Sequence, residues 1–347
     1  MSGSVSTASS PKPLLFIAGD IGGTKANLAV FQAVESAVGH ELIRIRQGRY
    51  PSAAYPGLNA ILREFLGTDT YYISGACFGV PGPVKNGRVK PTNLSWAVDA
   101  AEIHEEFGFN SVHVINDLLA NAHGISELHG ADFETLNPGI AENVGNRAVI
   151  SPGTGLGQAG LFFDGESYLP WACEGGHTDF APRNEGEIAL LQFLMKEFGR
   201  VSYERILCGQ GIENVYRFLR ETGRCAPTPS VEAEIKNGDA AAVISGHGLK
   251  GDCALCMQTL EMFVQILGAE AGNLALKTMA LGGVYIGGGI PAKILPKLRT
   301  TQFMNAFTDK GRLSAVMEGI PVHVVLNDDA ALLGAAHCAY IGNRKLR

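Results

Sequence analysis

The chain has 347 residues, with 28 Lys and Arg against 34 Asp and Glu, a formal net charge of −6, and 46% hydrophobic residues. This is the composition of a folded globular protein and excludes a disordered or fibrous chain. A mildly acidic chain without basic runs is not suited to binding nucleic acid or an anionic membrane. At roughly 150 residues per domain, the length predicts about two domains. Glycine is in excess, at 44 residues, which indicates tight turns and places where backbone approaches a ligand.

The N-terminus and the cysteines predict a cytoplasmic protein. Residues 1–13 are rich in serine and have no apolar core, so we expect a disordered tail rather than a signal peptide. No apolar stretch reaches the roughly 18 residues that a membrane span needs. We expect the seven scattered cysteines to be reduced thiols. Cys253 and Cys256 form a C-x-x-C pair, but no second Cys or His pair lies nearby to complete a zinc site, which favours one face of a packed helix.

The first half of the chain predicts an α/β domain with a mixed sheet. Its first two strands are joined by a glycine-rich turn and therefore form a hairpin. The predicted strands cover residues 14–18, 25–31, 41–50, 72–78 and 112–115, and the predicted helices cover 58–65 and 118–128.

The second half begins again with two strands joined by a Gly-Thr turn. A long helical region follows over residues 239–279, where Gly246 and Gly248 could break it. The predicted strands are 148–151, 158–163, 284–286 and 322–326, and the other predicted helices are 185–198, 211–221 and 330–340.

The turn between the first two strands is a candidate phosphate site. Three glycines and a threonine can bring backbone N–H groups and a hydroxyl onto a phosphate, and its aspartate could hold Mg²⁺. The turn joins strand to strand, so it is not a P-loop. The alternative is a plain hairpin with a hydrogen-bonded aspartate. The candidate residues are Gly19, Asp20, Gly22, Gly23 and Thr24.

Two glycine-rich turns in the second half strengthen this interpretation. Both follow predicted strands, and together with the first turn they describe a nucleotide held between two domains. Taken alone, the second of them precedes Pro291 and needs no ligand. The candidate residues are Gly153, Thr154, Gly155 and Gly157 in one turn, and Gly287, Gly288 and Gly289 in the other.

Polar residues at two further places are candidates for binding and catalysis. Asn116 and Asp117 end an apolar strand, where open α/β sheets place ligands, and Asp117 could act as a general base. The alternative is that Asp117 only caps the following helix. Vicinal hydroxyls could be bound by Glu174, His177 and Glu204. Taken one at a time, these residues have other interpretations: His177 could be a structural histidine, and Glu204 a solvated helix residue. A lone histidine without clustered ligands argues against a metal site there.

Five motifs occur in one order: Gly19-Asp20-Ile21-Gly22-Gly23-Thr24, Ile115-Asn116-Asp117, Ser151-Pro152-Gly153-Thr154-Gly155-Leu156-Gly157, Glu174-Gly175-Gly176-His177-Thr178-Asp179-Phe180-Ala181-Pro182 and Ser202-Tyr203-Glu204-Arg205. With these motifs, the chain resembles the bacterial-type glucokinases of the hexokinase and actin-like ATPase superfamily over roughly residues 14–342. The resemblance implies a two-domain, ribonuclease H-like α/β fold with a cleft between the domains. The small domain would cover 14–127 and be completed by a C-terminal helix over 330–347, and the large domain would cover 128–329.

The resemblance also implies the activity, which is transfer of the γ-phosphoryl group of ATP to the 6-hydroxyl of D-glucose. Asp117 would be the general base, and the other hydroxyls would be held by Asn93, Asn116, Glu174, His177 and Glu204. Turns 19–24 and 153–157 would take the phosphates of Mg-ATP, Asp20 would approach Mg²⁺ through water, and 287–289 would lie by the adenosine.

The resemblance further implies a homodimer, and no zinc is expected. The related ROK sugar kinases carry a cysteine-rich zinc motif after the histidine that matches His177, and residues 178–182 here contain no cysteine. The alternatives are a kinase for another hexose or one that uses polyphosphate, and a sugar-sensing regulator with a kinase fold. The regulator is disfavoured because the segment before residue 14 is too short for a helix-turn-helix and Asp117 is present.

Overall fold

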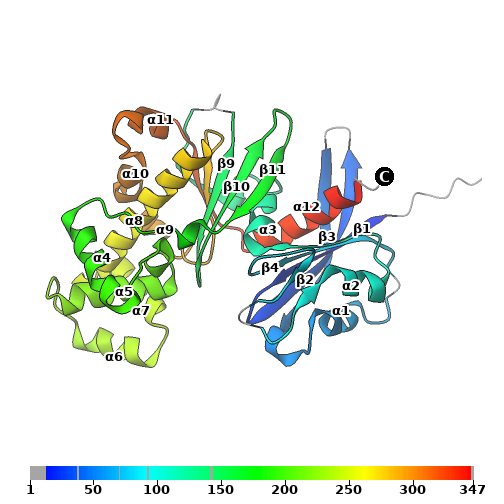
Figure 1. The fold of residues 1–347 in the computed structure, drawn as a ribbon, viewed down its shortest axis with the longest axis horizontal. Helices are drawn as coiled ribbons and strands as arrows, with labels where there is room; N and C mark the ends of the chain where they lie inside the picture. The colour runs from blue at the N-terminus through cyan, green and yellow to red at the C-terminus, as the bar shows by residue number, and fades with distance from the viewer. Residues whose placement is uncertain (1–12, 37–38, 70, 92–93, 141–143, 345–347) are drawn as a thin grey trace, which may run out of the picture. The chain divides into compact units, whose positions relative to one another are not determined.

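The protein is represented by a computed structural model that describes residues 13–36, 39–69, 71–91, 94–140 and 144–344. The predicted tail over residues 1–13 falls, except for its last residue, outside this described part. The chain divides into two compact units: unit 1 contains Met1–Glu127 and Ala331–Arg347, and unit 2 contains Leu128–Ala330. Figure 1 labels the elements of both units. None of the helices in the described part of the chain is long and apolar enough to span a bilayer.

Unit 1 is built on a five-stranded mixed sheet in the order β3-β2-β1-β4-β7. Strand β1 pairs antiparallel with β2 and parallel with β4, and β4 pairs parallel with β7. A separate two-stranded ladder joins β5 and β6. The elements of this unit are β1 (Leu14–Ile21), β2 (Lys25–Ser36), β3 (Gly39–Pro51), α1 (Leu58–Leu66), β4 (Ile73–Val80), β5 (Arg88–Val89), β6 (Val98–Asp99), α2 (Ala100–Phe107), β7 (Val112–Asn116), α3 (Asp117–Gly124) and α12 (Ala330–Arg344).

Both faces of the unit 1 sheet are covered, which explains why β1 is apolar at almost every position. Successive side chains of a strand point to opposite faces. Leu15 and Ile17 therefore join the core under α1, whereas Phe16 and Ala18 pack in a second core that includes residues of α12. Figure 1 shows α12 on one side of this sheet and α1 with α2 on the other.

Unit 2 contains a six-stranded sheet in the order β11-β10-β9-β12-β13-β8. The glycine-rich ends of β9 and β12 meet at one edge, because these two strands run parallel. The strands are β8 (Phe133–Asn137), β9 (Arg147–Pro152), β10 (Leu156–Phe163), β11 (Tyr168–Cys173), β12 (Val284–Ile286) and β13 (Val322–Val325). The helices are α4 (Glu185–Phe198), α5 (Gly209–Glu221), α6 (Pro229–Asn237), α7 (Ala240–Lys250), α8 (Ala254–Thr278), α9 (Leu295–Leu298), α10 (Thr301–Thr308) and α11 (Ser314–Glu318).

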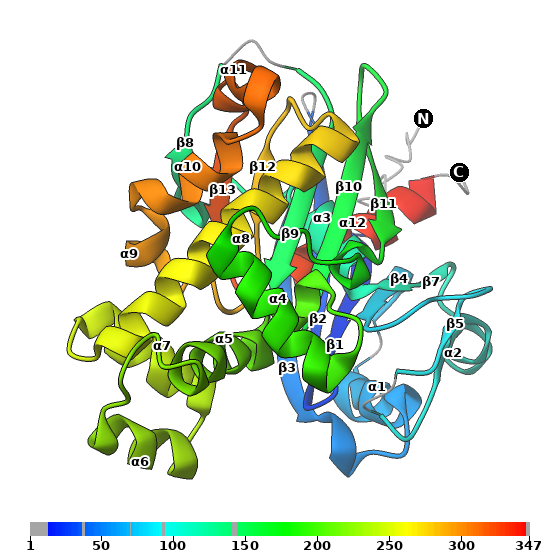
Figure 2. The same cartoon turned by 60° about the vertical axis from the view of Figure 1, so that its left-hand side comes forward.

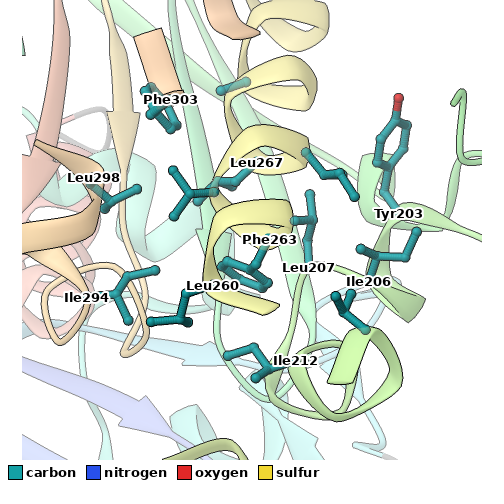
Figure 3. Packing of buried hydrophobic residues seen from close by; sticks show 14 of the residues in the cluster. Tyr203, Ile206, Leu207, Ile212, Leu260, Phe263, Leu267, Ile294, Leu298 and Phe303 are labelled. Carbon is teal, nitrogen blue, oxygen red and sulfur yellow. The ribbon is translucent and has the colours of Figure 1, made fainter. Parts of the chain in front are cut away.

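Helix α8 is the central element of the unit 2 core. Figure 2 shows it crossing the face of the sheet, and Figure 3 shows Leu260, Phe263 and Leu267 projecting from it among side chains of other elements. All three are fully buried. Because burying one such side chain contributes about 1.5–3 kcal/mol, this helix anchors the elements around it.

Several predicted boundaries are wrong, and each error has a local cause. The helical region over 239–279 does not break at Gly246 or Gly248, which both lie inside α7; it breaks at Gly251, which adopts a left-handed conformation with φ 77°. Cys253 is the residue before α8, and it and Cys256 are both buried.

The other errors concern short elements. Helix α3 ends at Gly124 rather than at residue 128, because the next N–H groups, such as that of Glu127, bond to carbonyls three residues back and tighten the turn. Helices α2, α6 and α9–α11 and strands β5, β6, β8 and β11 were not predicted. All seven cysteines are free in the structure.

Candidate functional site

The first glycine-rich turn closes the hairpin of β1 and β2 in unit 1. The N–H of Gly22 donates to the Lys25 carbonyl at 2.8 Å. Ser52, which lies beyond β3, fixes this turn from outside: its hydroxyl donates to the Gly22 carbonyl at 2.7 Å, and its N–H donates to the Thr24 carbonyl at 3.1 Å. Thr24 itself is exposed. The turn is therefore held rigidly while its hydroxyl stays accessible, as a phosphate-binding turn requires.

Asp20 and Asp117 lie at the same edge of the unit 1 sheet. The residue opposite Asp20 on β4 is Gly79, and the residue opposite Gly79 on β7 is Ile115. Two strand spacings separate Asp20 from Ile115, which is about 10 Å, and Asp117 follows two residues later. Asp20 is half-buried and accepts a hydrogen bond from the Asn27 amide at 3.4 Å.

Asn116 caps helix α3, and Asp117 is the first residue of that helix. The side-chain oxygen of Asn116 accepts the Leu118 N–H at 2.9 Å, and its amide donates to the Gly82 carbonyl at 3.2 Å. One oxygen of Asp117 also lies 3.0 Å from the Leu118 N–H. Because Asn116 occupies the capping position, capping alone does not account for an aspartate at position 117.

Glycines beside these residues are explained by packing. A Cβ on Gly19 would lie 2.6 Å from the Phe78 ring, and a Cβ on Gly79 would lie 2.8 Å from the Ala120 Cβ and 3.7 Å from the Asp117 Cα. Gly19, which was predicted as a phosphate-binding residue, is thus required by the core of the sheet.

Asn93, the weakest of the predicted sugar-binding residues, lies outside the described residues.

The second and third glycine-rich turns meet at one edge of the unit 2 sheet. The Gly153 turn connects β9 with β10, and its Thr154 is exposed. Gly287 follows β12, and its N–H donates to the Ile150 carbonyl of β9 at 2.9 Å. Gly288 packs against the Pro152 carbonyl with φ 86°, a conformation that favours glycine. The structure therefore brings together two turns that are more than 130 residues apart in the sequence.

Two glycines of these turns face open space. A Cβ added to Gly153 or to Gly289 would meet no atom of the described residues within 4 Å. Gly157 lies in β10, opposite Ser151. The open positions leave room for a ligand to approach the backbone of both turns.

Glu204 joins the Gly153 turn to the residues predicted to bind sugar. One of its oxygens accepts the Leu156 N–H at 2.9 Å, and the other lies 3.9 Å from Nδ1 of His177. A Cβ on Gly155 would lie 2.6 Å from the first oxygen, so glycine is needed for this contact. The His177 side chain is 55% exposed and the Glu204 side chain is 31% exposed, so both remain accessible.

A single tight turn, Gly175–His177, displays Glu174 and His177. The His177 N–H donates to the Glu174 carbonyl at 3.0 Å, and Glu174 is exposed. A Cβ on Gly176 would overlap the Leu156 carbonyl. The turn thus packs directly on the strand that leaves the Gly153 turn, which places Glu174, His177 and Glu204 beside it.

The sequence analysis missed residues that support the turn over Gly175–His177 and the first glycine-rich turn. Gln158 on β10 is 2% exposed, lies against Gly175, and donates from its amide to Glu270 at 2.8 Å. Burial and the charge of Glu270 raise the pKa of Tyr203 to about 12, so this neighbour of Glu204 stays un-ionised at neutral pH. The polar Gln158 in an apolar strand was a signal for a supporting role. Ser52 had no such signal, because its bonds to the first turn depend on the fold.

Comparison with known proteins gives the family. The sequence profile described as Glucokinase matches residues 17–341. The chain is 41% identical over 339 residues to a protein named glucokinase from Nostoc punctiforme, covering 94% of this chain and 98% of that one. The chain belongs to the glucokinase family. The family predicted from the sequence motifs is therefore confirmed.

Solved structures agree with the predicted fold. A glucokinase from an Antarctic psychrotroph is 34% identical and superposes with a TM-score of 0.83, covering 94% of this chain and 99% of that chain. A ROK family glucokinase from Streptomyces griseus, solved in complex with glucose and AMPPNP, has a TM-score of 0.61 and covers 94% of this chain and 100% of its own. At 20% identity, this second structure shows the fold alone. The two-sheet α/β architecture is the actin-like ATPase fold, as predicted.

Proposed function

We propose that this member of the glucokinase family transfers the γ-phosphoryl group of ATP to the 6-hydroxyl of D-glucose, giving glucose 6-phosphate and ADP. The observation that carries the proposal is the 41% identity to the Nostoc punctiforme glucokinase through 94% of the chain. The glucose and AMPPNP named for the Streptomyces griseus structure suggest the two substrates. The placement of candidate residues at two sheet edges supports the same reaction.

In this proposal, Asp117 accepts the proton of the 6-hydroxyl as it attacks phosphorus. Its place at the first turn of α3, with Asn116 as the helix cap, fixes its backbone at the carboxyl end of β7. General-base assistance of this kind is typically worth about 10²–10⁴-fold in rate. The attacking oxygen forms its bond to the γ-phosphorus as the bond to the β-phosphate oxygen breaks, and ADP leaves.

Glu174, His177 and Glu204 are proposed to hold the other hydroxyls of the sugar, with Asn116 and Asn93 as further candidates. Carboxylates accept hydrogen bonds from hydroxyls, and an imidazole can donate or accept. A sugar that lacks a matching hydroxyl leaves such groups unpaired, which is a strong source of discrimination. Both polar atoms of Asn116 already bond within unit 1, which favours a positioning role for it.

ATP is proposed to bind through the glycine-rich turns, and Mg²⁺ through Asp20. The turns at residues 22–24 and 153–157 would take the phosphates, and residues 287–289 would lie by the adenosine. A half-buried carboxylate at the sheet edge suits Mg²⁺, which prefers oxygen ligands and keeps several waters. When bound, Mg²⁺ neutralises charge on the phosphates. We further propose a cytoplasmic homodimer that supplies glucose 6-phosphate to glycolysis.

The role of Asp117 is tested by Asp117→Asn, with Asp239→Asn as the matched control. Asp239 caps α7, where its oxygen accepts the Ala242 N–H at 3.1 Å. Asparagine caps a helix about as well as aspartate, so Asp239→Asn should fold. Asp117→Asn leaves the cap of α3, Asn116, in place and should fold as well. We expect Asp117→Asn to bind glucose but to lose at least about a hundredfold in kcat, and Asp239→Asn to retain kcat. Near-normal turnover by Asp117→Asn would refute the base role.

Substrate choice is tested by ADP release with glucose, mannose, fructose and N-acetylglucosamine, using ATP or polyphosphate as donor. We expect the highest kcat/KM with glucose and ATP. A higher value for another hexose or for polyphosphate would favour the alternative kinases. Absence of sugar-dependent ADP release would exclude the enzyme and leave the sugar-sensing regulator.

A further inference from the structure

Unit 1 contains a cluster of two histidines and a glutamate that the proposed kinase reaction does not use. His40 lies on β3, Glu127 follows α3, and His337 lies on α12. One ligand atom from each side chain falls within 4.8 Å of the other two. The three residues are separated by up to about 300 positions in the sequence, so the cluster is produced entirely by the fold.

The distances within the cluster suit a small divalent cation. Nε2 of His40 lies 3.3 Å from Oε1 of Glu127, and Nδ1 of His337 contacts the same oxygen. Ligand atoms of a tetrahedral zinc ion, with bonds of roughly 2.0–2.1 Å, lie about 3.4 Å apart. Metal binding would therefore have to close the widest separation by at most about 1.4 Å and to open the contact between His337 and Glu127.

The cluster is sheltered but reachable. The side chains of His40, Glu127 and His337 are 17%, 11% and 18% exposed. Nε2 of His40 is buried and has no hydrogen-bond partner among the residues that the structure describes, although the Glu127 oxygen lies nearby. A ring nitrogen that is buried without a hydrogen bond is costly, and coordination of a cation would satisfy it.

Surrounding aromatic groups orient the two imidazoles. The His40 ring stacks on Tyr340 with centroids 4.2 Å apart, and the Tyr340 hydroxyl donates to Glu35 at 3.2 Å. The ring of His123 lies 5.6 Å from that of His337. Packing of this kind limits the rotation of the two rings. The site is thus partly preorganised.

The chemistry of the ligand set also favours a transition-metal cation. Two imidazole nitrogens and one carboxylate oxygen would supply three ligands. This ligand set is typical of zinc, with a fourth position left for water.

We infer that His40, Glu127 and His337 bind one divalent transition-metal ion, for which zinc is the best match. The expected absence of zinc rested on the segment after His177, which lies in unit 2 and is unrelated to this cluster. A metal here would join the β2–β3 hairpin, the end of α3 and helix α12. Because α3 begins at Asp117, the metal would restrain the helix that carries the proposed base.

The inference is tested on the untagged full-length protein, stripped with a chelator and then equilibrated with zinc chloride in the presence of millimolar Mg²⁺. We expect one zinc per chain by elemental analysis after gel filtration, since Mg²⁺ prefers oxygen ligands and competes poorly. The melting temperature should rise by about 5 °C at zinc concentrations a hundredfold above Kd. No zinc uptake by the wild-type protein would overturn the inference.

Single substitutions then assign the ligands. We expect His40→Ala and His337→Ala each to weaken zinc binding by at least about tenfold. His247→Ala is the matched control, because His247 also contacts two carboxylates. Its Nδ1 bonds to Asp252 at 2.7 Å and its Nε2 to Glu234 at 3.1 Å. The two carboxylates lie at opposite nitrogens of the ring, so both cannot bind the same ion as His247. Equal loss in His247→Ala, or unchanged uptake in the other two variants, would refute the assignment.

Cobalt substitution of the wild-type protein provides a readout that does not depend on any variant folding. Co²⁺ bound by imidazole and carboxylate gives visible ligand-field absorption, whereas Co²⁺ bound by thiolate adds an intense charge-transfer band in the near ultraviolet. We expect the first without the second, with zinc displacing the signal. A charge-transfer band would place the metal at a cysteine instead.

Discussion

Gly79 of β4 supports the helix that begins with Asp117, so a methyl group added there should affect both stability and catalysis. In Gly79→Ala the new Cβ would lie 2.8 Å from the Ala120 Cβ. Carbon atoms in ordinary contact are about 3.5–4.0 Å apart, so α3 must move by roughly 0.7–1.2 Å. Gly334 of α12 packs against the carbonyl of the same Ala120, which limits how α3 can move away.

Overpacking of this kind costs about 1–3 kcal/mol, and replacing glycine in a strand returns about 0.5–1 kcal/mol. The net loss expected for Gly79→Ala is therefore between about 0 and 2.5 kcal/mol; a loss of about 1 kcal/mol would lower the melting temperature by roughly 3 °C. The Asp117 Cα lies only 3.7 Å from the new Cβ, and misplacement of a catalytic group by 1 Å can cost about a hundredfold in rate. The expected signature is a large fall in kcat with a small loss of stability.

Gly246→Ala is the matched control. Gly246 lies inside α7, and a Cβ there would meet no atom of the described residues within 4 Å. The same chemical change should then stabilise the protein by about 0.5–1 kcal/mol and leave kcat unchanged. The melting temperature and the rate of ADP release are measured for both variants and compared with the wild type. If Gly79→Ala is as stable and as active as Gly246→Ala, then α3 is not held against β4 as described.

Two further predictions concern pH and the first glycine-rich turn. Hydrogen bonds to Asp252 and Glu234 raise the pKa of His247. The contribution of His247 to stability is therefore complete below its ordinary pKa and is lost as the pH rises through the raised pKa. The melting temperature of His247→Gln should fall below that of the wild type at pH 6, and the difference should be smaller at pH 9. Ser52→Ala removes the 2.7 Å bond to Gly22, worth about 1 kcal/mol, so the KM for ATP should rise about fivefold while the KM for glucose stays constant.

Elements with strong local signals were predictable from the sequence. Helix α4 runs over the predicted residues 185–198, because Asn184 caps its start and Gly199 ends it. Strand β12 also has its predicted bounds, 284–286, because an apolar run is cut off by three glycines. Strand β11 had no comparable signal. It lies at the edge of the sheet, where it pairs with β10, and its Trp171 remains 43% exposed.

Glycine was an ambiguous signal, because the same residue serves different purposes. Gly248 was predicted as a helix break but is needed inside α7, where a Cβ would lie 2.8 Å from the Cys256 carbonyl of α8. Gly19 was predicted at a phosphate but is required by the Phe78 ring. Gly153, in contrast, faces open space. The sequence shows where side chains are missing, and only the packing shows which absences make room for a ligand.

In unit 2, the groups proposed to hold phosphate and those proposed to hold sugar form one connected structure. Glu204 accepts the N–H of Leu156, the residue that leaves the Gly153 turn, and its second oxygen faces His177. A shift of Glu204 toward a sugar hydroxyl would therefore pull on the turn, and a shift of the turn would move the carboxylate. Leu156 also carries the carbonyl on which Gly176 packs, so one strand residue fixes both sides. This connection explains why the motifs around residues 153–157, 174–177 and 202–205, though far apart in the chain, depend on one another.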